Sequence, residues 1–187
     1  MAEAGRVILC MKWGTLYGPD YVNVLHNACR KAMPGPFRFV CLTDDATGLA
    51  EGVESYPIPD IGLAPRHWRG GGWPKFAVFK RDLCGLTGRA LFIDLDTVAI
   101  GTGPNWRPNR EAVELQVGTG IFAFTLGEQQ YLLDGLCANL DEMVATHGYE
   151  QDAVRALARS MAFWPADWVI SFKRHLRRPI GLDLVLE

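Results

Sequence analysis

The 187-residue sequence lacks a marked excess of either charge, since 19 lysines and arginines face 21 acidic side chains for a net charge of −2. Proteins that bind nucleic acid usually carry a clustered basic excess. Here only residues 173–178 bring several basic side chains together. We interpret that stretch as a solvated surface, with a contact to phosphate or acidic lipid as the alternative, and expect no nucleic-acid partner.

Long hydrophobic runs are also missing. No uninterrupted apolar run approaches the roughly 18 residues needed to cross a membrane. The first apolar run, residues 7–11, is too short for the core of a secretion signal and is followed directly by Lys12. We therefore predict no targeting segment, no transmembrane segment and a cytoplasmic protein.

Paired cysteines are absent as well. The five cysteines are odd in number, contain no Cys-x-x-Cys spacing and fall mostly inside apolar runs. This pattern favours buried, reduced thiols in a reducing compartment over a disulfide framework or a zinc site.

Regularly spaced apolar residues point to an α/β fold. Residues 6–11, 37–42 and 53–58 form short apolar runs typical of buried strands, and residues 89–95 form the strongest one. Between the first two, a helix is predicted from Pro19, because Val22, Leu25, Cys29 and Met33 recur at three- and four-residue spacing. Strand, helix and strand with short loops indicate a mostly parallel sheet with crossover helices.

The second half of the chain has weaker patterns. Helices are predicted over residues 73–86, 128–145 and 151–163, a strand over 121–126 and a turn-rich segment over 101–110. No repeat or linker interrupts the sequence, so residues 1–187 are expected to form a single domain, by the rough scale of 100–200 residues per domain.

Two carboxylates, Asp94 and Asp96, follow the apolar run Leu91-Phe92-Ile93. In open α/β sheets, ligands bind beyond the carboxyl ends of the strands. Neighbouring aspartates repel each other there, and a divalent cation removes that penalty. Ligands made only of oxygen favour Mn²⁺ or Mg²⁺. The plainer alternative is that both aspartates simply form the turn after the strand.

An ordered set of motifs resembles the donor-binding half of bacterial GT-A glycosyltransferases, in particular the family-8-like retaining enzymes. The motifs are Gly72-Trp73-Pro74-Lys75, Phe92-Ile93-Asp94-Leu95-Asp96-Thr97, the strand end Cys41-Leu42-Thr43-Asp44, Glu150-Gln151-Asp152 and residues 168–173. The resemblance implies an α/β/α sandwich around a mostly parallel sheet. It also implies a nucleotide-diphosphate sugar donor, with a UDP-sugar expected, bound with Mn²⁺ or Mg²⁺. The acceptor, a saccharide, lipid or protein, stays open.

The same resemblance assigns roles to single residues. Asp96 coordinates the metal, Asp94 binds the metal or the donor ribose, and Lys75 lies near the diphosphate or the donor sugar. The remaining assignments are Trp13 and Tyr17 around the base and ribose, Thr43 and Asp44 at the base edge, and the catalytic pair Gln151 and Asp152 at the transferred sugar. Ordinary structural roles are the alternatives: a core position for Trp73, a staple for Tyr17, a turn for Asp44 and a helix start for Asp152.

The sequence departs from the family pattern at two places, and both bear on catalytic turnover more than on the fold. Family members carry a His-Gly segment after the last strand that completes the metal shell, whereas here the nearest histidine, His175, stands among basic residues. A Gly118-Thr119-Gly120 turn replaces an Asn-Ser-Ser-like one. From these departures we expect the chain to be either a C-terminally truncated form of such an enzyme or a member that binds its donor weakly.

Two other functions stay open. A degenerate donor-fold domain could bind a nucleotide without turnover. A haloacid-dehalogenase-like phosphatase also carries Asp-x-Asp at a strand end, but it places a threonine four residues after the first aspartate. Here Val98 holds that position and the threonine comes one residue early, at Thr97.

Overall fold

A computed structural model of the chain describes residues 5–97 and 118–164. The chain separates into two compact units, one made of Met1–Gly101 with Val117–Arg159 and the other of Thr102–Gln116 with Ser160–Glu187. Nearly all described residues belong to the first unit, whose fold follows. The expectation of one domain over residues 1–187 stays a prediction.

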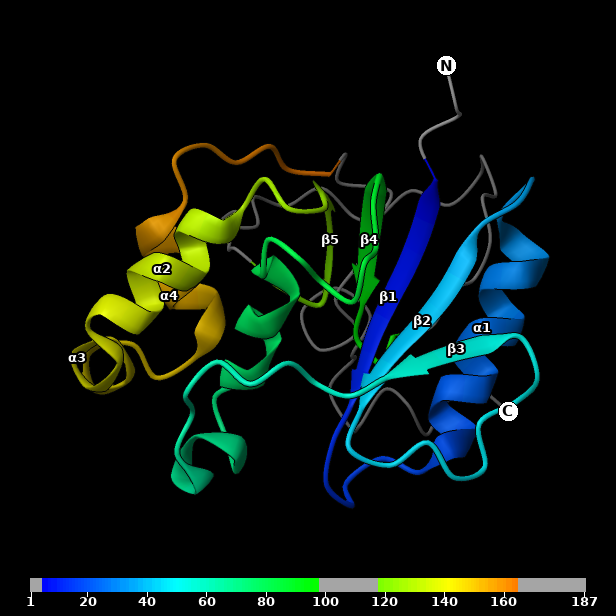
Figure 1. Ribbon diagram of the computed structural model, residues 1–187, viewed down its shortest axis with the longest axis horizontal. Coiled ribbons are helices and arrows are strands. Elements are labelled where there is room, and N and C mark those ends of the chain that lie inside the picture. The colour runs from blue at the N-terminus through cyan, green and yellow to red at the C-terminus, as the bar shows by residue number, and fades with distance from the viewer. Residues whose placement is uncertain (1–4, 98–117, 165–187) are drawn as a thin grey trace, which may run out of the picture. The chain divides into compact units, whose positions relative to one another are not determined.

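A five-stranded, mostly parallel sheet forms the centre of this unit (Figure 1). Its strands are β1 (Arg6–Lys12), β2 (Arg38–Thr43), β3 (Val53–Tyr56), β4 (Arg89–Ile93) and β5 (Ile121–Thr125). They lie in the order β3-β2-β1-β4-β5. Only the β4–β5 pairing is antiparallel. The predicted α/β class and mostly parallel sheet are therefore confirmed.

Helix α1 (Pro19–Ala32) is the crossover between β1 and β2. Pro19 stands in the first turn, where its missing N–H costs no helical hydrogen bond. Asp20 near the start, and Arg30 and Lys31 near the end, have the charges that the helix dipole favours. Val22, Leu25 and Cys29 of the predicted apolar face are buried, and His26 is buried with them. Met33, also predicted for this face, lies just past the end of the helix and is half-buried.

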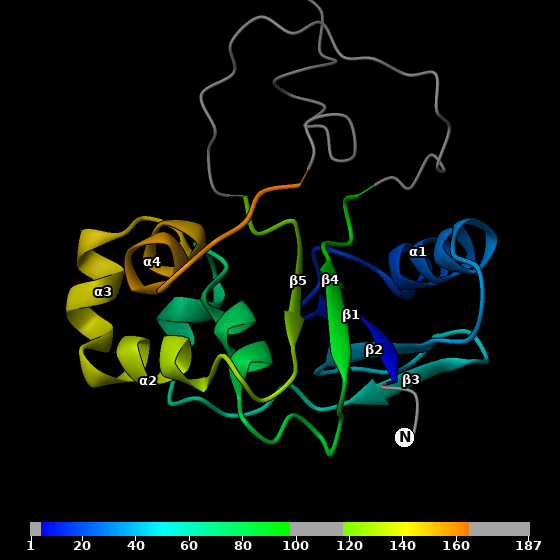
Figure 2. The same cartoon turned by 90° about the horizontal axis from the view of Figure 1, so that it is seen from above.

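Both faces of the sheet are covered, because the side chains of β1 alternate between two cores. Ile8 and Cys10 pack with α1, whereas Val7, Leu9 and Met11 pack with the segments on the other face. Those segments are the 3₁₀ helices η1 (Pro65–Trp68) and η2 (Trp73–Phe79) and the helices α2 (Gln130–Ala138), α3 (Leu140–Thr146) and α4 (Glu150–Leu157). Figure 2 shows α1 on the side of the sheet opposite η2 and α2.

The α-helix predicted over residues 73–86 is wrong. The structure has the 3₁₀ helix η2 there, followed by turns. Trp73, Phe76 and Phe79 recur at intervals of three, the period of a 3₁₀ helix, and their rings contact one another in sequence. Cys84 and Gly85, both at positive φ, stop any continuation as a helix. The spacing of three was therefore the informative signal.

Other boundaries also shift. The helix predicted over 128–145 is divided at Asn139 into α2 and α3, and the one predicted over 151–163 begins at Glu150 and ends at Leu157. Within the described ranges, no helix combines the length and hydropathy needed to cross a membrane. The predicted turn-rich segment 101–110, the basic stretch 173–178 and the strand 168–173 lie outside the described residues.

Helix α1 offers a matched test of its buried face. Val22 is fully buried and Val24, on the same helix, is 68% exposed. We expect Val22→Ala to lower the free energy of unfolding by about 2 kcal/mol, because two buried methyl groups are lost and a cavity is left. Val24→Ala should change it by less than about 0.5 kcal/mol. Urea denaturation followed by circular dichroism measures both; equal effects would contradict the described orientation of α1.

Candidate functional site

A cleft of about 500 Å³ opens beyond the carboxyl ends of β1 and β4. These two strands are neighbours in the sheet, and the strand order reverses between them. In open α/β sheets this reversal point is where ligands bind, since the connections leave in opposite directions and open a crevice. The lining residues are Met11, Trp13, Gly14, Thr15, Leu16, Tyr17, Trp68, Arg69, Gly70, Lys75, Asp94, Leu95 and Asp96.

The paired aspartates enter the cleft where β4 ends. The backbone N–H of Asp94 donates to the carbonyl of Gly120 at 2.8 Å, which continues the pairing toward β5 by one residue. Asp94, Leu95 and Asp96 all line the cleft, and Leu95 also packs in the core beneath α1. Asp94 is half-buried and Asp96 is exposed. Both aspartates line this cleft, and their metal-binding role stays a prediction.

Lys75 joins three segments of the chain through its ammonium group. Its Nζ lies 2.7 Å from Oδ2 of Asp94 and 3.0 Å from Oε1 of Glu150. A longer contact of 3.5 Å reaches the carbonyl of Thr119, and the ring of Phe92 lies below the ammonium at 5.7 Å. Because the side chains of Lys75 and Glu150 are only 12% and 8% exposed, this cluster is shielded from water. Removing one member would leave an uncompensated buried charge.

Glu150, the buried carboxylate of this cluster, was not predicted as a site residue from the sequence. It stands at the first position of α4, its backbone N–H donates to the carbonyl of Gly71 at 2.7 Å, and its Oε1 accepts a short hydrogen bond from the hydroxyl of Thr119. The carboxylate of Glu150 occupies the space that a side chain at position 72 would need, since a Cβ there would lie 2.5 Å from Oε2 of Glu150. Gly72 also has a φ of +71°, which favours glycine. The Gly71-Gly72 pair was the available signal, since it makes room for a nearby side chain.

Burial and charge shift the pKa values in this cluster. Burial raises the pKa of Asp94 to about 6; the ammonium of Lys75 opposes this shift, while Asp96 and Glu150 add to it. Burial lowers the pKa of Lys75, but Asp94 and Glu150 outweigh it and the net shift is upward. The pKa of Tyr17 is raised by burial and then by the charges of Asp96 and Asp94. The cluster therefore has excess negative charge, which attracts a cation.

Aromatic side chains form much of the cleft wall. The indole N–H of Trp13 donates to the carbonyl of Trp68 at 3.1 Å and so ties the loop after β1 to the end of η1. Tyr17, half-buried, packs edge-on against Tyr21 of α1. Trp13, Tyr17 and Trp68 all line the cleft, as expected for the first two; Trp68 was not predicted.

Four predicted residues do not line the cleft. Thr43 is buried and bonds to the backbone of Asp45, and the carboxylate of Asp44 accepts the N–H of Gly14 at 2.8 Å. Thr43 therefore shapes the loop after β2, and Asp44 joins that loop to the loop after β1. Gln151 is half-buried and Asp152 exposed in the first turn of α4, next to Glu150. The sugar-facing role of Gln151 and Asp152 stays a prediction, as does the base-edge role of Thr43 and Asp44.

The carboxylates fit a hard divalent cation only in part. Within residues 5–97 and 118–164, no three His, Cys, Asp or Glu side chains are grouped as a metal site. Among the described residues that line the cleft, the carboxylates are those of Asp94 and Asp96, and Lys75 already engages Oδ2 of Asp94. This set suits Mg²⁺ or Mn²⁺, which are commonly bound by one or two carboxylates with water and substrate phosphates.

No protein-family model matches the chain, and no curated protein matches it. Function therefore rests on the geometry of the cleft.

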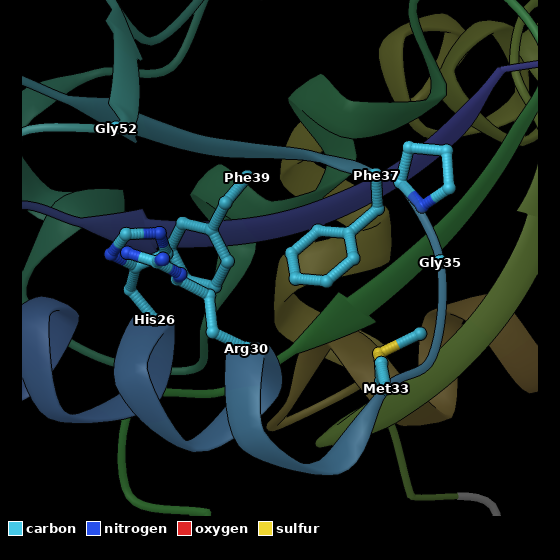
Figure 3. Close-up of a pocket in the computed structure, with 8 residues that line it drawn as sticks. His26, Arg30, Met33, Gly35, Phe37, Phe39 and Gly52 are labelled. Atoms are coloured by element: carbon cyan, nitrogen blue, oxygen red, sulfur yellow. The ribbon is translucent and has the colours of Figure 1, made fainter.

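A second hollow, of about 330 Å³, lies between the C-terminal half of α1 and the start of β2 (Figure 3). His26 and Arg30 line it together with the rings of Phe37 and Phe39, and its lining holds no carboxylate. Burial, with Arg30 next to it, lowers the pKa of His26. None of the predicted site residues lies there, so the cleft beside Asp94 is the stronger candidate.

The raised pKa of Asp94 has a measurable effect on stability. In the folded chain Asp94 keeps its proton up to about pH 6, whereas an unfolded aspartate releases it near pH 4. The folded state binds more protons in this window, so stability falls as the pH rises through it.

We expect the free energy of unfolding of the wild type, relative to Asp94→Asn, to fall by about 2–3 kcal/mol between pH 4 and pH 7. Denaturation in EDTA-containing buffer measures it without competition from metal ions. If the stability of the wild type relative to Asp94→Asn instead rises with pH, the attraction of Lys75 for the Asp94 carboxylate outweighs the effect of burial on its pKa.

Proposed function

We propose that the chain is a metal-dependent glycosyltransferase that moves a sugar from a nucleotide-diphosphate sugar to an acceptor. One observation carries this proposal: two carboxylates, Asp94 and Asp96, share an aromatic-walled cleft at the reversal point of a mostly parallel sheet. Such crevices are where α/β proteins bind nucleotides. The sequence resemblance to family-8-like GT-A enzymes supports the same reading.

Asp94 and Asp96 are the residues that would hold the Mn²⁺ or Mg²⁺ ion. When bound, the ion supplies positive charge to the oxygens of the leaving diphosphate, where negative charge grows as the bond to the anomeric carbon breaks. Lys75 pairs with Asp94 and is itself held by Glu150, so this ion cluster fixes the position of the Asp94 carboxylate. The carboxylate of Asp94 is thereby positioned before the donor arrives, which lowers the cost of reorganisation.

The walls of the cleft suit a nucleoside. Its volume of about 500 Å³ lies within the range of 300–1,000 Å³ typical of small-molecule sites. We assign the base and ribose to the side formed by Trp13, Tyr17 and Trp68, because aromatic faces stack on bases. The diphosphate then lies toward Asp94 and Asp96. A UDP-sugar is the proposed donor.

The finer fold class is part of this proposal. A strand order of 3-2-1-4-5 with an antiparallel last strand is compatible with a GT-A sandwich. Thr119, in the Gly118-Thr119-Gly120 turn, bonds to Glu150 and supports the cluster around Lys75. The turn that departs from the family pattern thus has a structural role here.

Metal-dependent nucleotide binding tests the proposal. We expect wild-type protein to bind UDP with Mn²⁺ and much more weakly without it. Asp96→Asn should weaken Mn²⁺-dependent binding at least about tenfold, since it removes a direct ligand. Asp134→Asn makes the same chemical change at an exposed residue of α2 that does not line the cleft, and should have no effect. Isothermal titration calorimetry measures all three.

Activity assays separate the functional alternatives. Release of sugar from a UDP-sugar that requires Mn²⁺ and Asp96 supports the transferase. Nucleotide binding without turnover identifies a degenerate donor-binding domain. Hydrolysis of a simple phosphomonoester, or no nucleotide binding by the wild type, would overturn the proposal.

A further inference from the structure

Lys75, the cation that sequence resemblance places near the diphosphate, is already engaged inside the protein. In the described structure its ammonium group donates to Oδ2 of Asp94 at 2.7 Å and forms an ion pair with Oε1 of Glu150 at 3.0 Å. A longer contact of 3.5 Å reaches the carbonyl of Thr119. Its positive charge is also outweighed by two carboxylates. Lys75 is therefore an internal counter-ion, and another group has to receive the ligand's phosphate charge.

Among the residues that the structure describes, Arg69 is the other cation that lines the cleft. It is exposed, directly follows η1 and stands next to Trp68, whose carbonyl is bonded to Trp13. Across the described part of the chain, no carboxylate forms an ion pair with it. Arg66, on the same short segment, differs in this respect, because it pairs with Asp141 at 2.7 Å and does not line the cleft. Arg69 thus keeps its full set of donors for a ligand.

We propose that Arg69, rather than Lys75, binds the diphosphate of the nucleotide donor. This inference rests on the proposed function and names the residue that receives the phosphate charge. Arginine suits the role because its planar guanidinium donates two parallel hydrogen bonds to one phosphate group. With a metal ion held by Asp94 and Asp96, both the ion and Arg69 would carry positive charge to the diphosphate, while Lys75 keeps Asp94 in position.

The test compares two matched variants, Arg69→Gln and Arg66→Gln, which remove the same charge from the same segment. Binding is measured by calorimetry with Mn²⁺ for a nucleoside diphosphate, its monophosphate and the free nucleoside. The series used is that of UDP, GDP or ADP, whichever the wild type binds most tightly. Arg69→Gln should weaken diphosphate binding about tenfold or more, as expected for a hydrogen bond between charged groups, and leave nucleoside binding unchanged. Arg66→Gln should bind all three ligands like the wild type.

Arg69→Lys refines the result, since it keeps the charge and loses the paired donors; it should recover only part of the lost affinity. Unchanged diphosphate affinity in Arg69→Gln, with a wild type that binds normally, overturns this inference and leaves the proposed function standing. An equal loss for diphosphate and nucleoside overturns it as well, because Arg69 would then act on the base or ribose. A wild type that binds no nucleoside diphosphate overturns both.

Discussion

The ammonium of Lys75 is the interaction on which the site depends. It draws the end of β4, the start of η2 and the start of α4 to one point, through Asp94 and Glu150. Charges this poorly exposed lose much of their hydration, so each is tolerated only while its partners are present. The geometry at Asp94 is therefore tied to the packing of two segments far from it in the sequence.

The same cluster explains why glycines stand at positions 71 and 72, directly before η2. Gly72 has a left-handed backbone and leaves space that the carboxylate of Glu150 fills, while the carbonyl of Gly71 accepts the N–H of the same residue. A side chain at position 72 would both strain the backbone and displace the carboxylate. The local turn and the long-range ion pair thus require the same residue, and a break in either one disturbs the other.

The sheet decides where the two aspartates can act. Asp94 and Asp96 follow a strand whose neighbours are β1 and β5, and the loop after β1 contributes Trp13 and Tyr17 to the same cleft. The crevice between β1 and β4 exists because the strand order reverses there. The same two aspartates at an edge strand would face solvent on one side and lack an aromatic wall.

Much of this arrangement follows from local patterns in the sequence. Apolar runs identified all five strands within a few residues, the spacing of Val22, Leu25 and Cys29 identified α1, and the position of Asp94 and Asp96 after the strongest run placed them at a strand end. The helix over residues 73–86 was wrong because Trp73, Phe76 and Phe79 follow a period of three. Trp68 and Arg69 were missed because no local pattern distinguishes them from ordinary core or surface residues. Glu150 was missed because its signal, the pair Gly71-Gly72, lies far from it along the sequence.

The sequence by itself determined the α/β class, the covered faces of the sheet and the pair of carboxylates, because periodicity and strand ends are properties of neighbouring residues. Only the tertiary structure decided that Lys75 is already paired with Asp94 and Glu150, and that Arg69 lines the same cleft with no ion pair to any described carboxylate. It also decided that Thr43 and Asp44 shape loops and do not line the cleft. These outcomes depend on contacts between residues that are dozens of positions apart in the sequence, such as the ion pair of Lys75 with Glu150 at 3.0 Å. Local sequence patterns carry no information about such contacts.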